Sequence, residues 1–248
     1  MYFPSDAFPA DLPLDAYDVV IPCYNRAHVV ADAVASVLAQ TAAPSRVIVV
    51  DDGSRDSSAD VIRALAAAHP GRIEAAILPR NGGASNARNV GASLCASPWI
   101  AFLDSDDVWL PGAADALLRG AMTSGADVIV GHFARLESGA APSEPECGWD
   151  GGCIRTGLRS GGVIGPSWSI VRRETVFDIG GFDPSFHNCN DWDFYTRAAA
   201  AAATFARINE TVALYRTVAG ARLVNDHEKG AENARRVLSH PYFRHRQS

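Results

Sequence analysis

The sequence predicts an α/β fold, in which a doubly wound mixed sheet is flanked by helices. Three observations support this. Short β-branched or aromatic runs alternate with helix-like segments over residues 18–103. The runs end in polar residues, and a chain of 248 residues with 48% apolar composition can bury a full core. Because such sheets bind ligands beyond the carboxyl ends of their strands, we expect a site along that edge.

Four strands are expected in the first half of the chain, each an apolar run bounded by turn residues. They cover residues 18–22, 46–51, 72–78 and 99–103. Three helices are expected between them, where apolar residues recur at helical spacing. They cover residues 27–40, a segment capped by Ser57 or Ser58 that ends near Gly71, and residues 85–93.

The second half is expected to add more elements of both kinds. Strands are expected at 127–133, 168–171 and 212–216, and helices at 112–124, 173–179, 190–203 and 227–238. Residues 137–165 are rich in Gly, Pro and Ser and are not assigned. We expect an irregular arm at 1–16, a nucleotide-binding half at 17–133, a second half of the same domain at 134–218, and a C-terminal helix and tail at 219–248.

An acidic turn follows the fourth strand, in the stretch WIAFLDSDDVWLP at 99–111. Asp104, Asp106 and Asp107 repel one another unless a positive group lies among them. Hard oxygen ligands at Asp-x-Asp spacing suit Mg²⁺ or Mn²⁺, which often bridge to phosphates. The alternative is a solvated turn that caps the helix near Pro111. We assign Asp107 to helix capping.

The overall composition excludes several classes of protein. The net charge of −6 and pI near 5.6 argue against a nucleic-acid binder. No apolar run is long enough to span a membrane, and no signal peptide is visible. The five cysteines lack CxxC spacing and are expected to be reduced thiols. We therefore expect a cytoplasmic protein whose membrane contact is at most peripheral, at the inner face.

The motifs together resemble glycosyltransferase family 2, inverting enzymes of the GT-A fold. The matching segments, in order, are VVIPCYNR at 19–26, VIVVDDGSRDSS at 47–58, RNGGASNARNVG at 80–91, FLDSDDVWLPG at 102–112, GGFDPSF at 180–186 and NDWDFYTRA at 190–198. The resemblance implies sugar transfer from a nucleoside diphosphate sugar, with a UDP-sugar favoured, to a saccharide or glycolipid hydroxyl. It also implies Mn²⁺ or Mg²⁺ as cofactor and a place in polysaccharide biosynthesis.

The resemblance also implies roles for single residues. Tyr24 would lie against the base, Asp52 would accept a hydrogen bond from the base edge, and Arg88 would meet the nucleotide or its phosphates. Their alternatives are a core tyrosine, a helix cap and a surface ion pair. The full set implied for donor binding is Pro22, Tyr24, Asp52, Arg88, Asp104, Ser105 and Asp106, with Asp106 and Asp104 as metal ligands.

Asp191 matches the general base of the family, which takes a proton from the acceptor hydroxyl during attack. Its alternative is a helix N-cap. Two departures stand out: Asn190 replaces the glutamate of many members, and Thr217 and Val218 follow Tyr215-Arg216 where many members carry a metal-binding histidine. A nucleotide-sugar-binding protein without turnover and a sugar nucleotidyltransferase are the competing functions.

Overall fold

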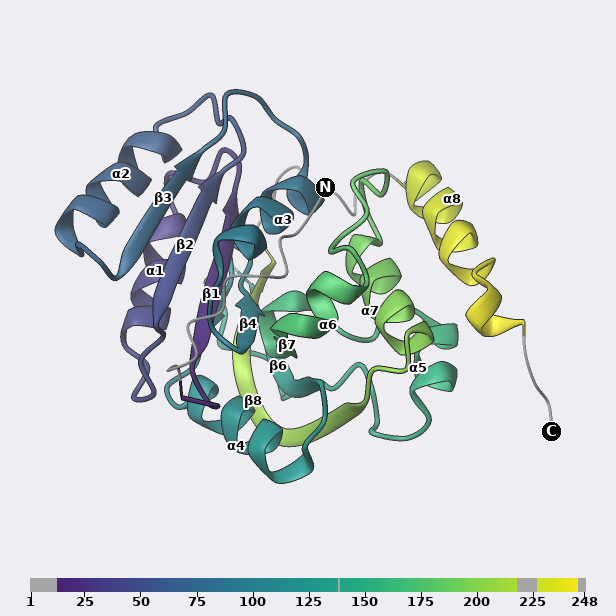
Figure 1. Cartoon of the computed structure of the whole chain (residues 1–248). Helices are drawn as coiled ribbons and strands as arrows, with labels where there is room; N and C mark the ends of the chain where they lie inside the picture. Colours follow the sequence, from purple (N-terminus) through teal and green to yellow (C-terminus); the bar gives the residue numbers. More distant parts are fainter. Residues whose placement is uncertain (1–12, 138, 218–226, 245–248) are drawn as a thin grey trace.

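The computed structural model describes residues 13–137, 139–217 and 227–244. Within them, an eight-stranded sheet has helices packed on both faces (Figure 1). The strand order is β3-β2-β1-β4-β7-β6-β8-β5, with both parallel and antiparallel neighbours. The predicted α/β class and mixed sheet are therefore confirmed. In the described part of the chain, every helix is too short or too polar to cross a lipid bilayer.

The first four strands are parallel and form one side of the sheet. They are β1 (Tyr17–Cys23), β2 (Arg46–Asp51), β3 (Ile73–Ile77) and β4 (Trp99–Phe102). The helices that connect them are α1 (Val30–Leu38), α2 (Ser58–Ala68) and α3 (Ala84–Leu94). β1 pairs with both β2 and β4, so the polar residues that follow these three strands emerge at one edge.

The second half of the chain completes the same sheet. Its strands are β5 (Val108–Trp109), β6 (Val128–Glu137), β7 (Ser169–Arg172) and β8 (Phe205–Thr217). β7 runs antiparallel to β4 and β6, and β5 runs antiparallel to β8. The helices are α4 (Ala113–Ser124), α5 (Ile154–Ser160), α6 (Arg173–Asp178), α7 (Asn190–Ala200) and α8 (His227–Leu238), with 3₁₀ turns at Pro166–Trp168 and Pro241–Phe243.

Side-chain alternation along the strands divides the core into two layers. Val19 and Ile21 of β1 pack in one apolar cluster with α1, α2 and α4. Val20 packs in the other, with α3, α5, α6 and α7. All of these strand side chains are fully buried. The two layers hold the sheet rigid and fix the edge at which the site is built.

Gly91 lets α3 lie directly on the sheet. A Cβ at this position would come within 2.3 Å of Val20 Cγ1 and 3.2 Å of Val50 Cγ2. We predict that Gly91→Val lowers the free energy of unfolding by about 3 kcal/mol, because overpacking displaces the helix or the strand side chains. Urea denaturation would measure the loss. Ser93→Val, which places the same side chain at an exposed position of α3, is the matched control, and an equal loss in both variants would contradict the prediction.

Several element boundaries differ from those expected. β5 was not expected, α5 lies in the unassigned stretch, and β8 begins seven residues earlier than residue 212. Ser57 occupies the N-cap position of α2, but its side chain makes no capping hydrogen bond. α7 ends at Ala200, not at residue 203. None of the five cysteines is paired in a disulfide.

A candidate active site at the carboxyl edge of the sheet

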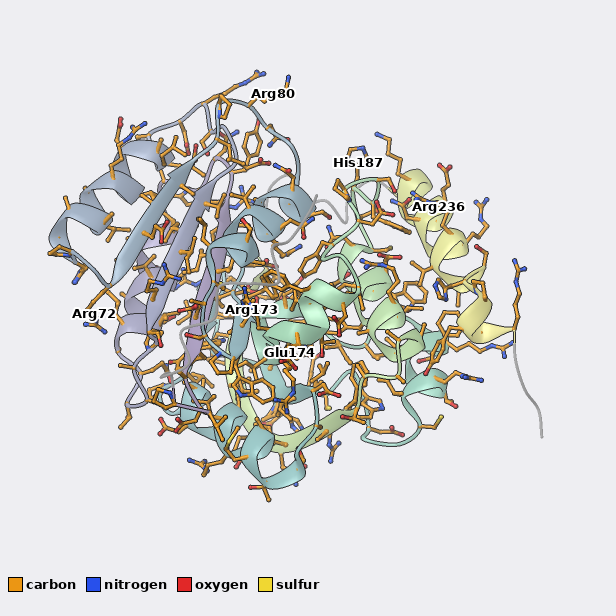
Figure 2. The ribbon with its side chains drawn as sticks, viewed as in Figure 1. Arg72, Arg80, Arg173, Glu174, His187 and Arg236 are labelled. Carbon is orange, nitrogen blue, oxygen red and sulfur yellow. The ribbon has the colours of Figure 1, made fainter. Side chains whose placement is uncertain are left out.

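A cavity of about 670 Å³ opens where β1, β2 and β4 end. The start of α3, the loop before α7 and Tyr215 of β8 complete its walls. In Figure 2, Arg72 lies at the lower end of β3, directly before the strand begins, and Arg80 lies above its upper end. His187 also lies toward the top of this view. All eight site residues named from the sequence line this cavity: Pro22, Tyr24, Asp52, Arg88, Asp104, Ser105, Asp106 and Asp191.

The ends of β1 and β2 supply Tyr24 and Asp52. Tyr24 is 37% exposed and therefore is not a core tyrosine. The buried Asp52 accepts hydrogen bonds from the backbone N–H groups of Gly82 at 2.9 Å and Gly83 at 2.8 Å. These bonds tie β2 to the start of α3, so Asp52 does not cap α2. Burial raises the pKa of Asp52, and the two N–H donors oppose that rise.

Arg88 joins the acidic turn to the second half of the chain. Its guanidinium donates to Asp104 at 2.6 Å and to the side-chain oxygen of Asn190 at 3.0 Å. It also lies 5.1 Å from the centre of the Phe182 ring. Arg88 is only 4% exposed, so the alternative of a surface ion pair is wrong. The arginine fixes the end of β4 relative to the start of α7.

The acidic turn is held from two other sides. Arg26 forms an ion pair with Asp106 at 3.5 Å. The buried Asp107 accepts hydrogen bonds from the Ser167 hydroxyl at 2.6 Å and from the Arg216 N–H at 3.1 Å. Burial, together with the charges of Asp104 and Asp106, raises the pKa of Asp107 well above its usual range.

The expected helix-capping role of Asp107 is therefore wrong. Gly112, in the left-handed conformation with φ 81°, is the N-cap residue of α4. Ser167 also accepts a hydrogen bond from the Asp104 N–H at 3.2 Å. Asp107 thus braces the acidic turn against the 3₁₀ turn at Pro166–Trp168 and against the end of β8.

Asp191 is the second residue of α7 and faces the same cavity as the acidic turn. It is not the N-cap, a position taken by Cys189 at φ 57°. Burial raises the pKa of Asp191. The backbone N–H of Trp192, which donates to its carboxylate at 2.8 Å, and the charge of Arg88 both oppose that rise. Asp193 instead pairs with Arg197 at 2.8 Å, one turn further along α7.

The protein groups that could hold a divalent cation are few. Across the described residues, no group of three or more His, Cys, Asp and Glu side chains has the geometry of a metal site. Asp104 and Asp106 offer carboxylate oxygens from one turn. Mg²⁺ is commonly bound by one or two carboxylates together with substrate phosphates, so this donor set fits a cation that arrives with a phosphorylated ligand.

The sequence has Thr217 and Val218 directly after Arg216, where many family members carry a metal-binding histidine. The structure describes this stretch only as far as Thr217. Residues 218–226 and the side chain of His227 lie outside the described part of the chain. Sequence reasoning did not identify Arg26 or Ser167 as partners of the acidic turn. Arg26 closes the motif VVIPCYNR, and that was the available signal, whereas no pattern marked Ser167.

Two known bacterial proteins illustrate what this chain is similar to in sequence. The succinoglycan biosynthesis protein ExoU of Rhizobium meliloti is 32% identical over 77% of this chain and 59% of its own length. The Escherichia coli UDP-Glc:alpha-D-GlcNAc-diphosphoundecaprenol beta-1,3-glucosyltransferase WfgD is 28% identical over 46% of this chain and 44% of its own length. The chain thus spans less than two thirds of these relatives.

A solved structure of TarS residues 1–349 from S. aureus, in complex with UDP-GlcNAc, is similar in fold. Its TM-score is 0.70 at 18% identity, covering 84% of this chain and 60% of TarS 1–349. This likeness confirms the GT-A-type fold expected from the sequence. The sequence model described as Glycosyl transferase family 2 matches residues 18–153. Because that match covers more than half of the 248 residues, the chain belongs to glycosyltransferase family 2.

Proposed function

We propose that this protein transfers a sugar from a UDP-sugar to a hydroxyl group of a saccharide or glycolipid, with inversion at the anomeric carbon. The observation that carries the proposal is the bridge made by Arg88. It links Asp104, at the end of β4, to the first residue of α7, directly before Asp191. A donor held at the acidic turn and a base at Asp191 would therefore share one cavity.

The proposed donor is a UDP-sugar. TarS binds UDP-GlcNAc in the complex described above, and the name of the E. coli relative begins with UDP-Glc, so similarity supports the choice. In this chain, the exposed ring of Tyr24 offers a surface for the base, and Asp52 offers carboxylate oxygens for a ring N–H. Stacking on an aromatic ring contributes about 1–3 kcal/mol per base. Pro22 and Ser105 line the same walls.

The charge of the cavity supports a role for Mn²⁺ or Mg²⁺. Its described lining residues include four aspartates, Asp52, Asp104, Asp106 and Asp191, but only two arginines, Arg26 and Arg88. The formal sum is −2, so a diphosphate alone would be repelled. We propose that Asp106, with Asp104, holds a divalent cation together with the diphosphate. The cation supplies positive charge that stabilises the departing diphosphate.

Asp191 is proposed to take the proton of the acceptor hydroxyl. A carboxylate with a raised pKa is a stronger base than an exposed one, and burial raises the pKa of Asp191. Attack from the side of Asp191, opposite the departing nucleotide, inverts the anomeric carbon. The cavity lining also includes Trp168, Phe186, His187 and Tyr215. Aromatic rings of this kind offer apolar faces to a saccharide acceptor.

Turnover and binding assays together test the proposal. We expect calorimetry to detect UDP binding that strengthens with Mn²⁺, and we expect UDP release from UDP-glucose or UDP-N-acetylglucosamine to increase when a saccharide acceptor is added. NMR of the product would report the anomeric configuration. UDP binding without transfer to any acceptor would favour a binding protein, and release of pyrophosphate from a nucleoside triphosphate and a sugar phosphate would favour a nucleotidyltransferase.

A further inference from the structure

The first turn of α3 carries a buried hydroxyl group without a hydrogen-bond partner. Ser85 is 2% exposed and lines the cavity, and its Oγ has no partner among the described residues. Arg88, one turn further along the helix, also lines the cavity, and its Nε has no partner there. Buried polar groups are nearly always hydrogen-bonded in folded proteins. Two buried polar atoms without partners on one cavity wall, the Ser85 Oγ and the Arg88 Nε, indicate that a ligand supplies a polar group there.

Ser85 lies beside the proposed base-binding residues. The Asp52 N–H donates to the carbonyl oxygen of Cys23 at 2.8 Å, which places Asp52 next to Tyr24. The Asp52 carboxylate accepts the Gly83 N–H, and Gly83 is the N-cap residue directly before α3. Ser85 follows two residues later. Tyr24, Asp52 and Ser85 therefore gather at one end of the cavity.

The electrostatics at this end favour a hydroxyl that donates. The N-terminus of a helix carries partial positive charge, and its first N–H groups have no partner within the helix. An oxygen atom of a ligand is thus better placed against the first turn of α3 than an amino group. Asp52, which bonds to the Gly83 N–H directly before α3, has the opposite preference. Its carboxylate only accepts hydrogen bonds, so it favours a ligand N–H group.

We propose that Ser85 selects the nucleobase, donating its hydroxyl hydrogen to the carbonyl oxygen at C4 of the base, beside the ring N–H from which Asp52 accepts a hydrogen bond. A donor next to an acceptor matches the carbonyl and N–H edge of uracil. Cytosine has the same size but presents an amino group and an unprotonated ring nitrogen, so both contacts would be lost and the carboxylate would face a lone pair. This assignment rests on the proposed function, because it presumes that a nucleotide occupies the cavity.

Titration calorimetry with UDP and CDP, at saturating Mn²⁺, tests the assignment on the whole chain. We expect Ser85→Ala to weaken UDP binding about fivefold to tenfold, the usual effect of one neutral hydrogen bond, and to leave CDP binding unchanged. The ratio of the two affinities should fall by the same factor. Ser93→Ala is the control, since Ser93 is exposed on the same helix and its hydroxyl already donates to the Val90 carbonyl oxygen.

The melting temperature separates ligand recognition from a structural role. Because the Ser85 hydroxyl has no partner among the described residues of the free protein, Ser85→Ala should not lower the melting temperature of the free protein, whereas the upward shift caused by UDP should shrink. An unchanged affinity ratio, or a less stable free protein that loses UDP and CDP affinity equally, would overturn the assignment. Failure of the wild-type protein to bind UDP would instead overturn the proposed function.

Discussion

Replacing Asp191 with asparagine is expected to lower the rate of sugar transfer by about 10²–10⁴-fold, the usual contribution of a general base. Asparagine keeps the size and the hydrogen-bond acceptor that the Trp192 N–H uses, so the start of α7 should keep its structure. UDP affinity should stay near the wild-type value, because the proposed phosphate and base contacts come from other residues. Single-turnover kinetics would measure the loss, and calorimetry would measure UDP affinity.

Asp193→Asn is the matched control for this substitution. Asp193 lies two residues further along α7 and pairs with Arg197, so this variant should lose some stability but keep its turnover. If Asp191→Asn turned over at the wild-type rate, another residue would have to act as the base.

The pH dependence of transfer gives the same experiment a second readout. Burial raises the pKa of Asp191 in the folded protein, and only the deprotonated carboxylate can accept a proton. The wild-type rate should therefore fall as the pH decreases through that raised pKa, at a higher pH than for an exposed aspartate. The residual rate of Asp191→Asn should lack this acidic limb.

The first half of the fold was predictable because each strand there is a short apolar run with its own turn signal. β2 was predicted with the correct ends, since RVIVVD is bounded by polar residues on both sides. β5 was missed because two residues form no pattern and exist as a strand only through pairing with β8. The alanines after residue 198 suggested a longer α7, but Ala202 adopts φ 67° and turns the chain instead.

The candidate site was predictable as a set of residues but not as a set of contacts. Asp104, Asp106 and Asp191 line one cavity, as expected. The two aspartates of the acidic turn follow a parallel strand, whose end marks the binding edge of such sheets, whereas Asp191 was named from the family resemblance. No local pattern indicated that Arg88 would pair with Asp104 and Asn190, since residue 190 lies far along the chain. The same applies to Asp107, whose partners Ser167 and Arg216 come from two other elements. Contacts at long sequence separation are set by tertiary packing and leave no local signal.

Replacing Asp106 with alanine is expected to remove the gain in UDP affinity that Mn²⁺ produces. In the wild-type protein we expect this gain to be about 10- to 100-fold, as for a hydrogen-bonded contact between charged groups. Calorimetric titrations of UDP with Mn²⁺ and with EDTA would measure it. Asp60→Ala, which removes an exposed carboxylate paired with Arg63 on α2, is the control and should behave as wild type.

Because Asp106 forms an ion pair with Arg26, the substitution should affect UDP affinity differently in Mn²⁺ and in EDTA. A cation at Asp106 would have to compete with the Arg26 guanidinium, which lies 3.5 Å from that carboxylate. Asp106→Ala removes one repelling charge from the cavity and leaves Arg26 without this partner. UDP affinity in EDTA should therefore be no lower than in the wild type, although the affinity in Mn²⁺ falls. A variant that loses affinity equally under both conditions would show that Asp106 holds the nucleotide or the fold directly, and an unchanged gain from Mn²⁺ would place the cation elsewhere.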